Sequence, residues 1–432
     1  MTLQEVQHFD ETTLYEKDGN NGRKKTGSVQ VAPKEEKTTM NASQPVKKTP
    51  NFIFYADAED VNMLDTKDDY DYINIEETNQ KKQRMNGFDP EYNNIVDYIV
   101  KITRQIWKEK DIGLIYDTYS TSISVHKGLI NSHGVNEVIS GTLQTLHAFP
   151  DRKGLGWSVI WSGDDEAGFF TSHRGRSVAT NLGDSLYGPA TGKKVMFRTS
   201  ADCMILNNKI YEEWLVMDTY HLVLQLGLDP VEFAKKMAKS TQKLAPAIQF
   251  GFKETAETGL PPKLFTPSSD EFEIGEFMQL VFNRIWARRS FNFVREYYEE
   301  NAVVHYVCNK DVIGVSEIQG MFMSLFASIP NGKVILERVT CNRRGSDSDW
   351  DVAVRWRIQG VHEGTGYFGA PSGKAIDIAG ISHYKIRNEK ISEEWLLFDG
   401  MEVLRQIYLP DEKESQQDGE TTMDDGNFTG VS

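Results

Sequence analysis

Two pairs of histidine and aspartate are the residues best suited to carry chemistry in this sequence. His126, in VHKG, and Asp218 recur in the second half of the chain as His305, in VHYV, and Asp399. A histidine near a carboxylate has a pKa close to neutrality and suits general acid–base catalysis. We therefore expect each pair to shift a proton next to a carbonyl group, provided that both side chains face one water-accessible cavity.

Both aspartates also have a structural interpretation as helix caps. Asp218 precedes TYHLVLQ and Asp399 precedes GMEVLRQ, and both segments are expected to be helical. Aspartate is favoured at the N-cap because its carboxylate accepts hydrogen bonds from N–H groups of the first turn. A duplication preserves a cap as well as a catalytic group, so the two roles are compatible. For the two histidines, a structural role or a position on the surface is as good an interpretation as a role in the cavity.

Four tryptophans at matched positions are candidates for contact with a substrate. Aromatic side chains of this size usually fill the core of a repeated domain, and the alternative is the wall of a binding cavity. His383 joins these candidates because it aligns with Asp202, and a change of residue type between copies suggests that the two cavities are not equivalent. The alternative for His383 is drift on an exposed strand. The tryptophans are Trp107, Trp214, Trp286 and Trp395.

A basic cluster, His173-Arg174-Gly175-Arg176, occurs in the first half and has no clear match in the second. It could hold an anionic substrate group through charge-assisted hydrogen bonds, whereas the alternative is a solvated cluster at the end of a strand. The stretch GPATGKK lacks the glycine spacing of a phosphate-binding loop. The histidines show no metal-ligand spacing. The sequence therefore predicts neither a metal nor a cofactor.

The second half of the chain is a diverged copy of the first. RQIWKEKD matches NRIWARRS, which places Trp286 at 179 positions after Trp107. NNKIYEEWLVMDTYHLVLQLG matches NEKISEEWLLFDGMEVLRQIY at an offset of 181. Register held through a turn, a tryptophan, an aspartate and a glutamine indicates duplication of a whole domain rather than a solenoid repeat.

Within each copy, helices come first and strands follow. Ile95, Ile99, Ile102 and Ile106 form one face of an amphipathic helix, a second short helix is expected at 291–299, and alternating β-branched and aromatic runs follow. This order predicts an α+β fold in which three helices pack on one face of a curved, mostly antiparallel sheet. NNK and NEK, between the last two predicted strands of each copy, predict tight hairpin turns.

Composition sets the expected domain boundaries. Segments rich in polar residues cannot offset the entropy of ordering, and a stretch rich in proline and glycine separates the copies. The segment 51–77 mixes aromatic residues with many carboxylates, so it is either a solvated tail or an element that docks on this protein or on a partner. The predicted organisation is a disordered tail at 1–50, an acidic and aromatic segment at 51–89, a first domain at 90–237, a linker at 238–271, a second domain at 272–409 and a disordered acidic tail at 410–432.

The bulk properties exclude several classes of protein. A formal net charge of −15 argues against nucleic acid as the main partner, because phosphate neutralisation needs a basic surface. The sequence contains no run of 18 apolar residues, so no membrane-spanning helix is predicted. Cys203, Cys308 and Cys341 are far apart and odd in number, and the N-terminus has no apolar leader. These features predict reduced thiols in a cytoplasmic protein.

The end of each copy carries a signature, EEW followed by two hydrophobic residues, one further residue and Asp, after a hairpin with NxKI. Together with the tryptophan that ends the first helix and the histidine in VHKG and VHYV, it resembles the SnoaL-like polyketide cyclase and ester cyclase branch of the nuclear transport factor 2-like superfamily. The resemblance covers approximately residues 90–230 and 272–410. It implies two cone-shaped domains, each a bent sheet wrapped around helices with a cavity between them.

The resemblance also implies an activity and an assembly. Such proteins act on small hydrophobic or polyketide-like substrates and dimerise across the sheet, so a tandem could form an intramolecular pseudo-dimer, with further oligomerisation left open. The cyclases use an aspartate three positions before the matched Asp, where this chain has Leu215 and Leu396, which cannot exchange a proton. Two hypotheses follow: a cofactor-free cyclase, isomerase or dehydratase, or a non-catalytic module that binds a ligand or a protein.

Overall fold

The computed structural model describes residues 50–56, 81–128, 130–242 and 261–410. The tails predicted at 1–50 and 410–432 lie outside these residues except for Pro50 and Pro410, and so does most of the predicted acidic segment. Residues 49–432 make up one compact unit that contains both copies of the repeat. Below, 81–242 is called the first half and 261–410 the second half.

The first half begins with a helix whose isoleucine face is buried, as its periodicity predicts. Asn94 caps this helix by accepting a hydrogen bond from the N–H of Asp97. Its elements are α2 (Ile95–Arg104), the π-helical turn η1 (Gln105–Glu109), α3 (Leu114–Thr118), β2 (Tyr119–Lys127), β3 (Ile130–His133), α4 (Val135–Ala148), β4 (Lys153–Asp164), β5 (Gly168–Thr180), β6 (Lys194–Leu206), β7 (Lys209–Met217), α5 (Thr219–Gln225) and α6 (Pro230–Gln242).

The second half repeats this order without a counterpart of α6. Its elements are α7 (Ile274–Val281), the π-helical turn η3 (Phe282–Ala287), the short helices η4 (Phe291–Phe293) and α8 (Val294–Tyr297), β8 (Tyr298–Tyr306), β9 (Lys310–Ile313), α9 (Val315–Ser328), β10 (Lys333–Arg344), β11 (Ser346–Val361), β12 (Ala375–Arg387), β13 (Lys390–Phe398) and α10 (Gly400–Ile407).

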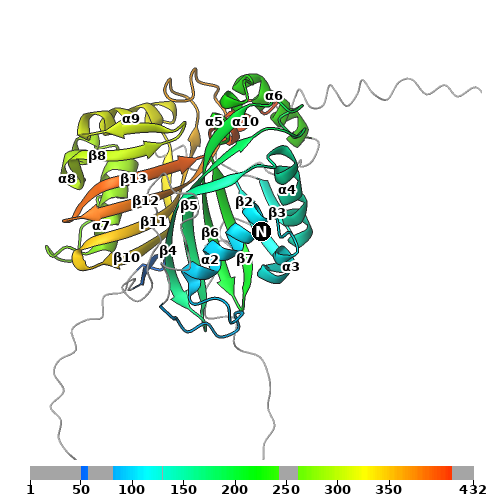
Figure 1. The fold of residues 1–432 in the computed structure, drawn as a ribbon. Helices are drawn as coiled ribbons and strands as arrows, with labels where there is room; N and C mark the ends of the chain where they lie inside the picture. Colours follow the sequence, from blue (N-terminus) through cyan, green and yellow to red (C-terminus); the bar gives the residue numbers. More distant parts are fainter. Residues whose placement is uncertain (1–49, 57–80, 129, 243–260, 411–432) are drawn as a thin grey trace, which may run out of the picture. The chain divides into compact units, whose positions relative to one another are not determined.

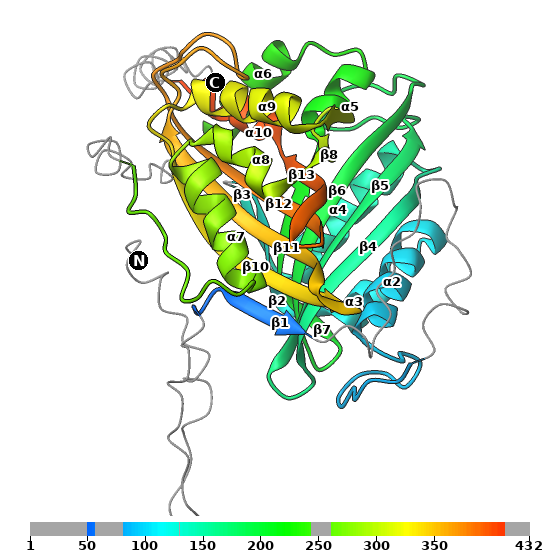
Figure 2. The same cartoon turned by 90° about the vertical axis from the view of Figure 1, so that its left-hand side faces the viewer.

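Each half contains one sheet, and the two sheets have the same strand order. The first runs β3-β2-β7-β6-β5-β4, and the second runs β9-β8-β13-β12-β11-β10 with the short strand β1 (Ile53–Ala56) added at its edge. Within the described halves, β2–β7 and β8–β13 pair in parallel and the other neighbours are antiparallel. Figure 2 shows α7, α8 and α9 in front of the second sheet. The predicted tandem α+β architecture is confirmed.

The predicted hairpins are present, but two strands were missed in each half. Asn207 and Asn208 have φ of 48° and 65°, and Asn388 has φ of 49°, as expected for turns that match the strand twist. The segment that contains VHKG or VHYV forms a strand, β2 or β8, and a short strand, β3 or β9, follows it; the sequence patterns predicted none of these. Glu299, expected in a helix, lies in β8, because parallel pairing with β13 extends that segment.

The two sheets lie against each other (Figure 1), and side-chain contacts between them occur in matched pairs. The guanidinium of Arg174 in β5 lies 3.4 Å from the ring centroid of Trp395 in β13, and that of Arg355 in β11 lies 3.7 Å from Trp214 in β7. Both arginines and both tryptophans are related by the offset of 181. Each half therefore places an arginine on a tryptophan of the other half, as the two subunits of a two-fold dimer do. The expected intramolecular pseudo-dimer is present.

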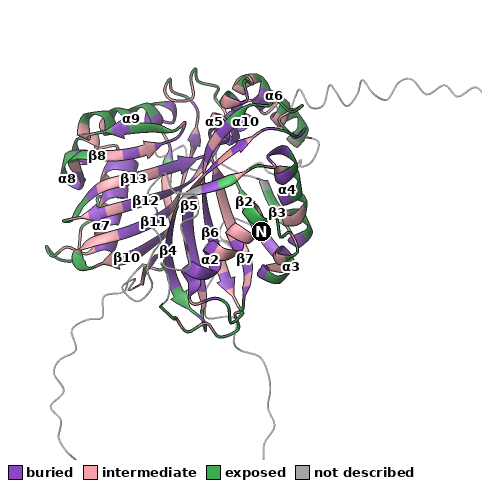
Figure 3. Cartoon of the chain, viewed as in Figure 1, coloured by how far each residue is buried: buried purple, intermediate pink, exposed green. Residues whose placement is uncertain are grey.

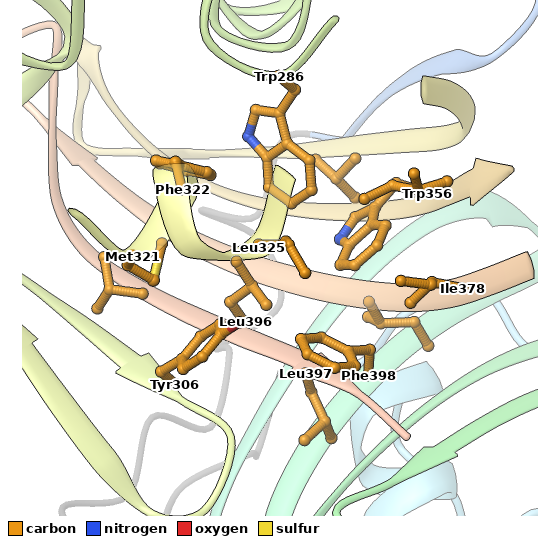
Figure 4. Packing of buried hydrophobic residues seen from close by; sticks show 14 of the residues in the cluster. Trp286, Tyr306, Met321, Phe322, Leu325, Trp356, Ile378, Leu396, Leu397 and Phe398 are labelled. Atoms are coloured by element: carbon orange, nitrogen blue, oxygen red, sulfur yellow. The ribbon is translucent and has the colours of Figure 1, made fainter. Parts of the chain in front are cut away.

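The second half is filled by one aromatic core. Trp286, Trp356 and Phe322 are fully buried, and the ring centroids of the two tryptophans are 4.8 Å apart. Figure 4 shows these rings between α9 and the sheet, with Phe398 and Leu396 beside them. In Figure 3 the strands are mostly buried or intermediate, while α4, α6 and α9 carry exposed residues.

Two segments outside the repeat differ from expectation in extent. The chain remains helical to Gln242 in α6, so the first residues of the linker predicted at 238–271 are helical. β1 pairs in parallel with β10, and Tyr55 donates a hydrogen bond of 2.5 Å to Glu273. Docking of the longer acidic segment stays a prediction, because residues 57–80 lie outside the described ones. In the part of the chain that the structure describes, no helix is long and apolar enough to cross a membrane.

Candidate functional site

The first half encloses a cavity of about 900 Å³. Apolar residues of α2 and η1, including Ile102 and Ile106, form one wall, and residues of α4 and of β5–β7 form the others. The second half closes part of the chamber with Asp377 of β12 and with Asp399 and Glu402 around α10. A cavity of this size suits a small organic ligand that is largely removed from water.

The first half is hollow because small residues replace the large ones that fill the second half. Gly175 of β5 pairs with Thr199 of β6, and at the offset of 181 Trp356 of β11 pairs with Gly380 of β12. Cys203 likewise stands where the second half has Tyr384, which is buried. The two domains therefore have the same backbone fold, but the first contains a cavity where the second has a packed core.

Glu213 is a carboxylate on the sheet side of this cavity. Side chains alternate along β7, so Glu213 and Leu215 face the chamber, while Glu212 and Trp214 face the opposite side. Burial raises the pKa of Glu213, and Lys127 partly opposes this effect. Glu213 is therefore a carboxyl group that keeps its proton to a higher pH than usual while it contacts a space open to a ligand.

The equivalent acid in the second half has no such space. Glu394 is fully buried and accepts a hydrogen bond of 2.6 Å from the hydroxyl of Tyr298. Burial raises the pKa of Glu394 to about 7, with hydrogen bonds from Tyr298 and Tyr384 opposing it. The first half keeps Tyr119 at the place of Tyr298 but has lost the second tyrosine, which leaves Glu213 facing the cavity.

Three further polar side chains surround the cavity. Burial lowers the pKa of His173 to about 4, so its imidazole is neutral at pH 7. Arg152 lies with its guanidinium 4.0 Å from the ring centroid of Trp107, and its Nε donates to Ser177 Oγ at 3.0 Å. Trp107 thus lies on the cavity wall, where its candidate role in substrate binding stays a proposal.

Asp399 reaches the same cavity from the second half. Its Oδ1 accepts hydrogen bonds from the N–H groups of Met401 and Glu402, at 2.9 and 3.3 Å, and its Oδ2 accepts one of 2.8 Å from Thr219. Burial raises the pKa of Asp399 to about 7, and the Thr219 hydroxyl opposes this. Asp399 is therefore a helix cap that also lines the cavity, and its candidate catalytic role stays a proposal.

Asp218 caps α5 and contacts the second half, but it does not line the cavity. Its Oδ1 accepts from the N–H of His221 at 3.2 Å, and its Oδ2 accepts from the N–H of Cys308 at 2.6 Å. These bonds favour the capping interpretation for Asp218. They also connect α5 to the turn after β8.

The two candidate histidines lie on the outer side of their sheets. His126 stands between Val125 and Lys127, which both line the cavity, so alternation turns the imidazole away from it. His126 Nε2 lies 2.9 Å from Glu212 Oε1, and its ring stacks on Trp214. The structure therefore corrects the proposed pairing with Asp218.

His305 repeats this arrangement. Its Nδ1 lies 2.8 Å from Asp311 Oδ1, and its ring stacks on Trp395 with 4.9 Å between centroids. Asp399 belongs to the cavity on the other side of the sheet, so the second histidine–aspartate pair is not formed either. Both histidines take part in packing the two sheets together.

The remaining candidates for substrate contact also lie away from the cavity. Trp214 and Trp395 lie between the sheets, and Trp286 belongs to the filled core of the second half. His383 is 2% exposed, and its Nε2 is 2.9 Å from Ser172 Oγ of the first half. The hypothesis of drift on an exposed strand is thus wrong for His383, because the strand is buried between the halves.

Sequence reasoning missed Glu213, although one signal pointed to it. Leu215 occupies the position of the catalytic aspartate in the resembling cyclases, and Glu213 is two residues earlier on the same strand. Residues i and i+2 of a strand share a face, so Glu213 points to the same side of the sheet as Leu215. Among the residues described, no group of three His, Cys, Asp or Glu side chains could hold a metal ion.

The element order and strand order define each half as an α+β domain in which helices precede a mostly antiparallel sheet. Residues 276–407 match the sequence model of the SnoaL-like polyketide cyclase family, which confirms the resemblance for the second half. The match falls on the half whose interior is filled, whereas the cavity lies in the other copy.

Several solved structures are similar to part of the chain. One is a protein from Jannaschia sp. CCS1 named for the SnoaL-like polyketide cyclases, with 20% identity over 33% of this chain and 100% of that chain and a TM-score of 0.29. A protein from Bacillus cereus named for polyketide cyclases has 18% identity over 32% and 84%, with a TM-score of 0.26. TsrD from Streptomyces laurentii has 15% identity over 31% and 94%, with a TM-score of 0.27. No curated protein matches the chain.

Proposed function

We propose that the first half is a cofactor-free proton-transfer enzyme of the cyclase, isomerase or dehydratase type, with Glu213 as its general acid or base. The observation that carries this proposal is a carboxyl group of raised pKa on the wall of a cavity of about 900 Å³. A carboxyl group of raised pKa is a stronger base than an ordinary carboxylate, which favours its use as a general base and then as the acid that returns the proton.

The walls of the cavity indicate the class of substrate. Ile99, Ile102 and Ile106 offer aliphatic surface, and Trp107 offers an aromatic face beside the guanidinium of Arg152. A small, mostly apolar molecule with one or a few carbonyl or hydroxyl groups suits such walls, since the polar groups then fix its orientation. This agrees with the polyketide-like ligands that the family resemblance implies.

Two other groups support the chemistry. His173 is neutral at pH 7 and can donate a hydrogen bond to a carbonyl oxygen as negative charge develops on it. Burial raises the pKa of Asp399 to about 7, and this residue adds a further carboxyl group to the cavity from the second half. In this arrangement Glu213 removes a proton next to the carbonyl, and the protonated group then returns it to another atom of the substrate.

The test begins with the small molecules that purified protein retains, identified by mass spectrometry. Those ligands and related ketones are then incubated with the protein in deuterated water, and deuterium uptake next to the carbonyl is followed. We expect Glu213→Gln to lower the exchange rate by at least about 100-fold while binding persists. Glu212→Gln is the matched control, because this neighbour faces the outer side of the sheet and pairs with His126.

Exchange that survives in Glu213→Gln at the wild-type rate would overturn the assignment of Glu213. Retention of a ligand by the wild-type protein without any turnover would instead favour the non-catalytic binding module. In that case Glu213→Gln should change affinity alone.

A further inference from the structure

We propose that ligands enter the large cavity between α4 and the turn at 184–187, and that Lys127, Leu186 and Met217 determine which molecules can pass. All three side chains line the cavity. This entrance belongs to the ligand site of the proposed function and rests on that assignment, but it does not depend on which group transfers a proton.

The opening of the cavity is marked by side chains that line it and are also exposed to solvent. They include Leu143, Gln144 and His147 of α4 and Asp184 and Leu186 of the turn between β5 and β6. Leu143 is 50% exposed and Leu186 is 62% exposed. Exposed aliphatic side chains beside a cavity suit the entry of an apolar ligand.

The second half contains the same turn. Ser185 and Gly188 exchange two backbone hydrogen bonds of 2.9 Å across the tip of the first turn. Gly366 and Gly369 form the matching bridge in the second half, at the offset of 181. The two turns can therefore be compared residue by residue.

Three aromatic rings meet beside the turn of the second half. They belong to Tyr306 of β8, Tyr367 of the turn and Phe398 of β13, and are called the aromatic cap below. The ring centroids of Tyr306 and Tyr367 are 5.6 Å apart, and each of them lies 5.9 Å from that of Phe398. Edge-to-face rings pack densely, so the aromatic cap closes the second half at this place.

The first half lacks the aromatic cap. The residues at the matched positions, in the same order, are Lys127, Leu186 and Met217, at offsets of 179, 181 and 181. None of them carries a ring, and the side chains of Lys127 and Leu186 are exposed. The absence of three rings leaves an opening into the first half where the second half is closed.

A glycine allows the second turn to contact its helix, and the first turn lacks that glycine. The N–H of Tyr367 donates to the carbonyl oxygen of Ser324 in α9 at 3.0 Å, and a Cβ on Gly366 would lie 2.5 Å from the same oxygen. Ser185 occupies the position of Gly366 and has this Cβ. In the described part of the first half, no backbone hydrogen bond joins Leu186 to α4. The tip of the first turn is therefore not fastened to its helix, which agrees with an entrance between them.

Rebuilding the aromatic cap in the first half tests the entrance. The variant Lys127→Tyr/Leu186→Tyr/Met217→Phe carries the three rings. The probe is 6-propionyl-2-(dimethylamino)naphthalene, an apolar ketone whose fluorescence emission changes when it leaves water. Stopped-flow fluorescence of the full-length protein measures its association and dissociation rates. We expect both rates to fall by at least about tenfold while Kd changes by less than about threefold, because the rings obstruct the path and not the cavity.

Two controls separate entry of the probe from other effects. Leu182→Tyr adds the same ring to the same segment, at a residue that is 56% exposed and does not line the cavity, and should leave both rates unchanged. Gly175→Trp with Thr199→Gly fills the cavity itself and should abolish binding, which would place the probe there. The measured quantity is probe entry, so a failure of the proton-transfer chemistry assigned to Glu213 would not alter it.

Four results would overturn the entrance. These are unchanged rates in a capped variant that unfolds at the wild-type Tm, a loss of affinity without slower association, equal slowing by Leu182→Tyr, and a wild-type protein that does not bind the probe. If the triple variant does not fold, Ser185→Gly with Leu186→Tyr restores the glycine and the tyrosine of the second-half turn. The association rate of that variant should still fall by at least about threefold.

Discussion

Trp356 fills in the second half the space that Gly175 leaves open in the first. The Trp356 ring is fully buried, lies 4.8 Å from the ring of Trp286, and donates a hydrogen bond of 3.0 Å from Nε1 to Ser382. A Cβ on Gly380 would overlap this indole, so the glycine is needed opposite the tryptophan. One exchange of large and small residues across a strand pair thus separates a filled domain from a hollow one.

Filling the first cavity should abolish ligand binding without unfolding the protein. Gly175→Trp with Thr199→Gly reproduces the second-half pair of Trp356 and Gly380. We expect retained ligand to fall by at least tenfold, while the free energy of unfolding stays within about 1 kcal/mol of wild type, because the new side chain enters existing space. Mass spectrometry and urea denaturation measure the two quantities. Thr199→Gly alone is the control and should keep the ligand; wild-type retention by the double variant would contradict the assignment of the cavity.

The buried carboxyl of Glu394 should make stability depend on pH. Burial raises its pKa from 4.5 to about 7, so between these values the folded protein holds a proton that the unfolded chain releases. The folded state therefore gains stability as the pH falls from 7 to 4.5, and above pH 7 the charged form weakens folding by about 3 kcal/mol. Glu394→Gln removes this titration. The free energy of unfolding of the variant, relative to that of the wild type, should therefore increase as the pH rises from 5 to 8.

Chemical denaturation at several pH values between 5 and 8 measures this difference. Glu393→Gln is the control, since Glu393 is partly exposed and pairs with Lys385 at 2.9 Å. Its difference from wild type should not follow the same pH trend. A constant gap between Glu394→Gln and wild type across the range would show that Glu394 does not titrate in this window.

Much of this fold could be predicted from local patterns, and the site only in part. The helix face of Ile95, Ile99 and Ile102 and the NNK and NEK turns are encoded in neighbouring residues, so periodicity and turn chemistry found them. The strand that carries His126 depends on parallel pairing with β7, a contact distant in sequence. Alternation along β7 could have given the direction of Glu213, but the cavity beside it depends on the side-chain volumes of residues from several strands.

The buried ion pair of Arg355 and Asp202 should contribute more to the free energy of unfolding than ion pairs on the surface do. Asp202 is 1% exposed and lies 3.0 Å from Arg355 Nη1 across the boundary between the halves. Arg355→Met removes the cation that is hydrogen-bonded to this buried carboxylate and should cost about 3–5 kcal/mol at pH 7. Adding Asp202→Asn should recover part of the loss, and urea denaturation of the four proteins gives the coupling energy. Arg343→Met, at the exposed pair with Asp347, should cost less than about 1 kcal/mol; equal costs at both sites would refute the argument.

Asp399 should set a titration near pH 7 that can be moved in a known direction. Burial raises its pKa to about 7, and the Thr219 hydroxyl lowers it by bonding the charged form. Thr219→Val removes that donor, so the titration should move to higher pH. Asp399→Asn should remove it while α10 stays capped, because asparagine serves the N-cap nearly as well as aspartate. Carbon-13 NMR of labelled aspartate carboxyls measures the titration directly, and the pH profile of deuterium exchange shows whether it governs the chemistry. A titration that persists in Asp399→Asn, or that moves to lower pH in Thr219→Val, would assign the group near pH 7 to another residue.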